Sequence, residues 1–146
     1  MKTPKRIFID TSGWIELILS GEKFHKEVTA YFTDELKKGS NLFTSDYVLD
    51  ESFTRLLTNQ SFHSAKTLRE KTREAQKAGH LLIFWMDEVL FDKTWDFFEK
   101  FNDQNMSFTD ASIAALMRNF KLDEILTLDQ GFRNIGFTVK PSIIKH

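Results

Sequence analysis

Short apolar runs alternate along this chain with longer segments whose apolar residues recur at helical spacing, and this alternation limits the fold more than any other feature. The strand-like runs cover residues 5–9, 41–45, 80–86, 124–129 and 136–139. The helix-like segments cover about residues 12–19, 23–38, 46–60, 61–78, 88–100 and 107–119, with Ser12 expected to cap the first. Strands separated by helices form βαβ units, so the sequence predicts an α/β fold with a mainly parallel sheet and helices on both faces.

The composition fits one globular domain over residues 1–146. Hydrophobic residues make up 41% of the chain and phenylalanine alone occupies 15 positions, which is enough for a sizeable core. The absence of cysteine excludes disulfides, thiolate metal sites and cysteine nucleophiles. No apolar run is long enough for a signal peptide or a membrane span, so we expect a cytoplasmic protein with no membrane partner.

The formal net charge of −1 argues against a protein that binds nucleic acid through phosphate neutralisation over its whole surface. A nucleic-acid partner would have to be held by a local basic patch or by metal ions in an acidic site.

Four acidic residues occupy corresponding places in the predicted βαβ units. Asp10 directly follows the first strand, and Asp129 ends the strand over 124–129. Glu51 lies in the helix after the second strand, and Asp110 opens the helix that starts at Ser107. Because ligand sites in such folds lie outside the carboxyl ends of the strands, we expect these four side chains to converge at that edge.

A cluster of this kind requires a cation. Two carboxylates about 4 Å apart repel by about 4 kcal/mol at an effective dielectric constant of about 20, so several together raise one another's pKa values unless a positive charge is present. Mg²⁺ prefers oxygen ligands and keeps several waters, and such waters suit attack on a phosphodiester. The pattern therefore favours a metal-dependent phosphodiesterase.

Each acid also has a structural alternative. Asp10 could cap the first helix, and Asp129 could hold the turn before Gly131. Ser107 and Asp110 have the spacing of a capping box. Asp50 and Glu51 point about 100° apart on a helix, so periodicity does not decide which one enters the site, and Glu51 could be merely solvated. The occurrence of four such acids at strand ends favours the metal site over four separate structural roles.

The sequence resembles one known family at these same residues. The stretches "IFIDTSGW", "TSDYVLDESFTRL", "SFTDASIAALM" and "LTLDQGF" closely resemble the motifs of the PIN-domain nucleases, and among them the VapC-type toxins of toxin–antitoxin pairs. The likeness runs from about residue 6 to residue 139, with the motifs in family order. It implies a PIN-like three-layer α/β/α sandwich and metal-dependent hydrolysis of RNA that leaves a 5′-phosphate and a 3′-hydroxyl.

The resemblance also implies a site and partners. It makes Asp10, Glu51, Asp110 and Asp129 the catalytic ligands of Mg²⁺ or Mn²⁺, with the polar side chains of Thr11, Ser12 and Ser107 beside them. VapC-like members are typically homodimers that a VapB-like antitoxin neutralises by laying its C-terminal segment over or near the active site. The alternative to a nuclease is a catalytically quiet RNA-binding or assembly module, which would bind no divalent ion.

Two further features carry weaker expectations. A run of basic residues could contact RNA, although a solvated helix face with Lys/Glu pairs is the favoured interpretation; its members are Lys66, Arg69, Lys71, Arg73 and Lys77. The three tryptophans, Trp14, Trp85 and Trp95, are expected in the core. Surface or capping roles are expected for Asp46, Asp50 and Asp103.

Overall fold

The structure is a computed structural model that describes residues 4–143. Its strands are β1 (Arg6–Ile9), β2 (Asn41–Ser45), β3 (Leu81–Phe84), β4 (Glu124–Leu126) and β5 (Val139–Lys140). Its helices are α1 (Thr11–Ile18), α2 (His25–Lys37), α3 (Asp46–Asn59), α4 (Phe62–Lys77), α5 (Glu88–Lys100), α6 (Phe108–Asn119) and α7 (Gly131–Asn134), with a 3₁₀ turn η1 (Asn102–Gln104) between α5 and α6. None of the helices is long and apolar enough to cross a membrane within this part of the chain.

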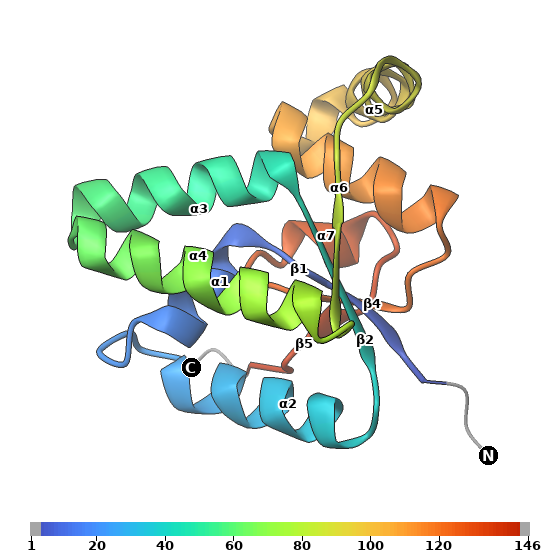
Figure 1. The fold of residues 1–146 in the computed structure, drawn as a ribbon. Coiled ribbons are helices and arrows are strands. Elements are labelled where there is room, and N and C mark those ends of the chain that lie inside the picture. Colours follow the sequence, from blue (N-terminus) through green and yellow to red (C-terminus); the bar gives the residue numbers. More distant parts are fainter. Residues whose placement is uncertain (1–3, 144–146) are drawn as a thin grey trace.

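The five strands form one sheet in the order β3-β2-β1-β4-β5, and all four pairings are parallel. In the register Phe8 of β1 lies opposite Phe43 of β2 and Ile125 of β4. Helices α1–α4 gather on one side of the strands, and α5 packs on α6 on the other (Figure 1). The predicted α/β/α sandwich is confirmed, with a sheet that is parallel throughout.

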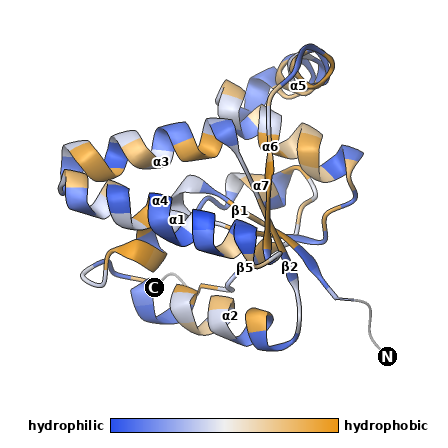
Figure 2. Cartoon of the chain, viewed as in Figure 1, coloured by the Kyte–Doolittle hydropathy of each residue, from blue (hydrophilic) through white to orange (hydrophobic). Residues whose placement is uncertain are grey.

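The core is centred on β1 and β4, where strands are covered on both faces. Phe8 and Ile125 are fully buried, as is almost all of the segment 111–117 in α6. Apolar residues follow the central strands, whereas most helices alternate apolar and hydrophilic positions (Figure 2). A nearly continuous apolar run is what a doubly covered parallel strand requires.

The chain reverses its direction across the sheet between β1 and β4. It moves outward from β1 to β2 and β3, then returns to place β4 on the other side of β1. The carboxyl ends of β1 and β4 therefore form the switch point at which open α/β sheets bind their ligands.

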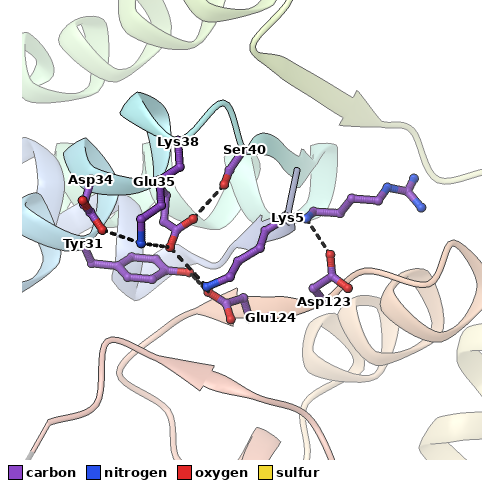
Figure 3. A network of polar contacts seen from close by, with 9 residues as sticks. Lys5, Tyr31, Asp34, Glu35, Lys38, Ser40, Asp123 and Glu124 are labelled. Atoms are coloured by element: carbon purple, nitrogen blue, oxygen red, sulfur yellow. Dashed lines mark hydrogen bonds and ion pairs between the residues drawn. The ribbon is translucent and has the colours of Figure 1, made fainter. Parts of the chain in front are cut away.

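A polar network closes the opposite, amino end of the sheet (Figure 3). The Lys5 ammonium lies 3.3 Å from a carboxylate oxygen of Glu35 and 3.5 Å from one of Glu124. The Ser40 hydroxyl donates to Glu35 at 2.7 Å, and the Tyr31 hydroxyl donates to Glu124. These two buried acids thus have a cation and hydroxyl donors beside them.

Several predicted boundaries are wrong by a few residues. Asp10, not Ser12, caps the first helix, which begins at Thr11. Strand β4 ends at Leu126, so the chain has left the sheet before it reaches Asp129. The last strand covers 139–140 instead of 136–139, and the short helix α7 was not predicted.

The tryptophan prediction holds for one residue of three. Trp14 is buried, and its indole nitrogen donates to the Thr44 hydroxyl at 3.0 Å. The prediction is wrong for Trp85 and Trp95, which are 67% and 50% exposed. They lie after β3 and on α5, at the outer side of the molecule where no further element covers them within the described residues.

Candidate functional site

Asp10 lies at the switch point and is held from two sides. Its side chain is 6% exposed. One carboxylate oxygen accepts from the Thr11 amide at 2.7 Å, which makes Asp10 the N-cap of α1. The other oxygen accepts from the Thr127 hydroxyl at 2.9 Å. The capping role and the site role are therefore compatible, since the cap fixes the direction of the carboxylate.

A hydroxyl pair ties the start of α1 to the segment after β4. The Thr127 hydroxyl accepts from the Asp129 amide at 3.0 Å and lies 3.1 Å from the Ser12 hydroxyl. Ser12 in turn accepts from the Leu128 amide at 2.9 Å. This close approach needs Gly13, because a Cβ there would lie 2.7 Å from the Leu126 carbonyl oxygen.

Thr127 is the site residue that the sequence analysis missed. It is fully buried and contacts two of the candidate acids, through the carboxylate of Asp10 and the amide of Asp129. Its signal was present in the stretch "LTLD", where a hydroxyl stands two residues before the acid at the end of a strand. Its partner Asp10, which directly follows β1, could be identified only from the pairing of β1 with β4.

Asp110 and Asp129 lie together beside a small pocket. Asp110 forms the predicted capping box: its amide donates to the Ser107 hydroxyl at 3.0 Å, and the Ser107 amide donates to its carboxylate at 3.3 Å. One oxygen of Asp129 accepts from the Gly131 amide at 2.8 Å. Both carboxylates line a pocket of about 80 Å³ that Phe132 helps to close.

Glu51, and not Asp50, faces the other acids. Glu51 is partly buried on α3, whereas Asp50 is exposed. The Glu51 charge contributes to the raised pKa values of both Asp10 and Asp110. Its carboxylate also lies 3.8 Å from the Arg55 guanidinium, one turn further along the helix.

The electrostatics join the four acids into one site. Burial, together with the smaller contributions of the Asp110 and Glu51 charges, raises the pKa of Asp10 to about 7, against the lowering effect of its hydrogen bonds. Burial also raises the pKa of Asp110, with added contributions from Asp129 and Glu51. Side chains from four elements therefore repel one another across the carboxyl edge of the sheet.

The donor set fits a hard divalent cation. Within residues 4–143, no three His, Asp or Glu side chains are already spaced to hold one ion. Mg²⁺ does not require such a cage, because it usually binds through one or two carboxylates and keeps several waters. The buried Thr11 hydroxyl, next to Asp10, has no hydrogen-bond partner in the described part of the chain. Such an orphaned group is commonly explained by a water or an ion.

The remaining acids named from the sequence have other places. Asp46 accepts from the Tyr47 amide at 2.9 Å and from the Met86 amide at 3.1 Å, so it joins the start of α3 to the end of β3. Asp103 is exposed in η1. The surface or capping role expected for Asp46 is not what the structure shows, because Asp46 is half-buried at the first residue of α3 and Ser45 is the N-cap.

Comparisons with known proteins agree with this geometry. The family model described as "PIN domain" matches residues 7–138. The 23S rRNA-specific endonuclease VapC20 of Mycobacterium tuberculosis is 26% identical over 136 residues, which cover 92% of this chain and 98% of that protein.

Solved structures show the same fold. The crystal structure of the sarcin-ricin loop cleaving toxin VapC20 of M. tuberculosis superposes with a TM-score of 0.77 at 23% identity, covering 90% of this chain and 96% of that one. FitAcB of Neisseria gonorrhoeae has a TM-score of 0.63 at 18% identity, covering 92% and 96%. VapBC2 of Rickettsia felis, bound to a promoter DNA fragment, has a TM-score of 0.68 at 12% identity, covering 92% and 97%.

Proposed function

Since the chain belongs to the PIN domain family, we propose that it is a divalent-metal-dependent endoribonuclease that hydrolyses RNA phosphodiester bonds to 5′-phosphate and 3′-hydroxyl products. The observation that carries the proposal is the electrostatic coupling of Asp10, Glu51, Asp110 and Asp129 at the switch point of the sheet. The proposal treats residues 1–146 as a single domain.

The four carboxylates are the proposed ligands of Mg²⁺ or Mn²⁺. When bound, such an ion supplies an activated water for attack on the phosphorus and positive charge for the leaving oxygen. The role of the chain's other side chains is to position these carboxylates. The Ser12–Thr127 pair holds Asp10 and the backbone before Asp129 at fixed separation. The Ser107 capping box holds Asp110 in the same way.

The name of the M. tuberculosis relative supports a toxin that acts on ribosomal RNA. We extend to this chain the toxin role, action in the cytoplasm, and neutralisation by a VapB-like antitoxin. The complexes among the similar structures support an antitoxin partner. An apolar groove of about 520 Å³ between α1, α2 and α4, lined by Trp14, Phe32 and Leu81 among others, is a suitable place for one.

We also propose a homodimer. Exposed apolar side chains gather on and before α5, at Trp85, Val89, Phe91 and Trp95. Surfaces of this kind mark protein–protein contacts more often than free surface.

The test is 5′-end mapping of cellular RNA after brief induction of the wild type and of Asp10→Asn. New 5′-phosphate ends that appear only with the wild type are the expected result, and they would also identify the target. Identical end profiles from two folded proteins, together with no binding of Mg²⁺ or Mn²⁺, would favour the quiet RNA-binding module.

A further inference from the structure

The turn between α3 and α4 carries an exposed groove at the edge of the molecule. We name it the hairpin groove; its volume is about 370 Å³, and its lining residues are Phe53, Thr54, Leu57, Phe62, Ala65, Lys66 and Arg69. The Leu57 and Phe62 side chains are 52% and 69% exposed. The hairpin lies at the outer edge of the molecule, away from α5 and α6 (Figure 1). Neighbouring exposed apolar side chains that form a groove mark binding sites, whereas isolated ones do not.

The charges of the groove are of one sign. Lys66 and Arg69 line it, and no lining residue is acidic. Within residues 4–143 neither of these two side chains is in an ion pair, whereas Arg55 on α3 pairs with Glu51. A chain with a net charge of −1 can hold a polyanion through a local basic patch such as this one, in addition to metal ions in an acidic site.

Helical spacing places the aromatic and the two cations in one row. Phe62, Lys66 and Arg69 occupy positions i, i+4 and i+7 of α4, which share a face. The buried residues Leu68 and Thr72 mark a different face of α4. A stacking ring beside phosphate-binding side chains is the combination used to bind single-stranded nucleic acid.

The groove and the acidic site share helix α3. Thr54, in its wall, stands one turn after Glu51, at about 4.5 Å along the helix axis, and Leu57 stands at about 9 Å. One strand can therefore contact both places.

We propose that the hairpin groove binds a single-stranded segment of the RNA substrate beside the scissile phosphate, with a base stacked on Phe62 and phosphates bound by Lys66 and Arg69. The inference rests on the proposed function in one respect, since it takes this RNA to be the substrate. It reverses the interpretation favoured from sequence for the first two residues of the basic run.

The test measures RNA binding without cleavage. The probe is an RNA of 12 nucleotides with a mixed sequence that does not pair with itself, labelled with fluorescein at its 5′ end. Its binding is measured by fluorescence anisotropy in EDTA at several salt concentrations. The variants are Phe62→Ala and the double variant Lys66→Gln/Arg69→Gln. The matched control is Lys26→Gln/Lys37→Gln, which removes two exposed lysines from α2, where Asp34 lies between them.

We expect Phe62→Ala to weaken binding of the single strand about fivefold or more, and to leave binding of the same RNA annealed to its complement unchanged. The groove double variant should reduce the slope of log affinity against log salt by about 1.4, that is, about 0.7 for each lost phosphate contact. The α2 control should keep the wild-type affinity and slope. Thermal unfolding followed by circular dichroism confirms that each variant is folded.

Cleavage of the same RNA in Mg²⁺ is measured in parallel to separate the two proposals. If the groove variants cleave the RNA and keep the wild-type affinity and salt slope, the groove proposal is overturned and the nuclease proposal stands. A wild type that binds through the groove and does not cleave supports the groove and contradicts the nuclease. Groove variants that keep RNA affinity but lose self-association in light scattering, or a wild type that does not bind the probe, also overturn the groove.

Discussion

Buried acids gather at both ends of the same sheet, but their surroundings differ. At the amino end, Glu35 and Glu124 lie beside the Lys5 ammonium, and Lys38 also lies 3.8 Å from Glu35. At the carboxyl end, within residues 4–143, none of Asp10, Asp110 and Asp129 is in an ion pair. Glu51 alone has a cation, and its distance from Arg55 is 3.8 Å.

This difference shows that burial by itself does not identify a functional acid. Glu35 and Glu124 are as buried as Asp10, yet their charges are neutralised by the protein. At the carboxyl end, burial and the charges of neighbouring acids instead raise the pKa values of Asp10 and Asp110. An uncompensated acidic cluster is costly to fold, so its compensation by an external cation is the simplest physical explanation.

The largest expected effect is on the rate of RNA cleavage, which should depend on the acids at the carboxyl end of the sheet and not on those at the amino end. Asp110→Asn should reduce RNA cleavage by at least about 100-fold, because loss of even a residue that supports a ligand costs about 10–100-fold. Asparagine can still accept from the Ser107 amide, so the fold should remain. Glu124→Gln at the amino end should keep the rate within about twofold. Initial rates on one labelled RNA test the pair, and equal losses in both variants would remove the distinction between the ends.

Next in size is the pH dependence of stability in EDTA. The pKa of Asp10 is raised to about 7 from an ordinary value of 3.8, so the folded form binds this proton more tightly than the unfolded form. The free energy of unfolding should therefore fall as pH rises from about 4 to about 7, by up to about 4 kcal/mol. Urea titrations at several pH values measure this fall.

Asp10→Asn provides the control for that experiment. It removes the titrating group while keeping an oxygen that can cap α1. The variant should be more stable than the wild type at pH 8 without metal. A fall with pH of the same size in both proteins would assign the effect to other groups.

Metal addition should produce the third effect. A ligand that binds only the folded state at 100 times its dissociation constant stabilises it by about 2.7 kcal/mol. Mg²⁺ or Mn²⁺ should raise the unfolding temperature of the wild type and of Glu124→Gln, and should have little effect on Asp10→Asn. Differential scanning calorimetry with Ca²⁺-free buffers measures the shift, and an equal shift in all three proteins would place the ion elsewhere.

The smallest effect belongs to the amino end. Two carboxylates outweigh the burial that lowers the pKa of Lys5, so the pKa of this ammonium is raised. Lys5→Met should cost only about 1 kcal/mol at pH 7, since the Lys5 side chain is 45% exposed and Lys38 remains near Glu35. The loss should shrink at high salt, because ions screen the pairs that this half-exposed ammonium makes with Glu35 and Glu124. Urea unfolding at low and at high salt measures it, and a loss that grows with salt would contradict the role of Lys5.

The sequence predicted what depends on local pattern. The apolar runs and helical spacing placed nearly every element, and the Ser107–Asp110 spacing predicted a capping box that the structure contains. Two features depended on tertiary contacts instead. The Asp10–Thr127 hydrogen bond follows from the pairing of β1 with β4. The choice of Glu51 over Asp50 follows from how α3 is rotated against the sheet.

The exposure of Trp85 and Trp95 illustrates the same limit. An apolar pattern shows that a face can be buried, but not that the chain supplies an element to cover it. The family likeness indicated which acids to consider together, and the assignment of all four as metal ligands stays a prediction that the first and third experiments test.

The link between Asp10 and Thr127 joins residues that are 117 positions apart in the chain. During synthesis at about 5–20 residues per second, the segment that completes the site leaves the ribosome about 6 to 23 seconds after Asp10. No shorter nascent chain can pair β1 with β4, since β4 is still unmade. A growing chain would thus lack the complete acidic site until β4 and the segment after it have been made, so a partner protein could meet the chain before this site forms.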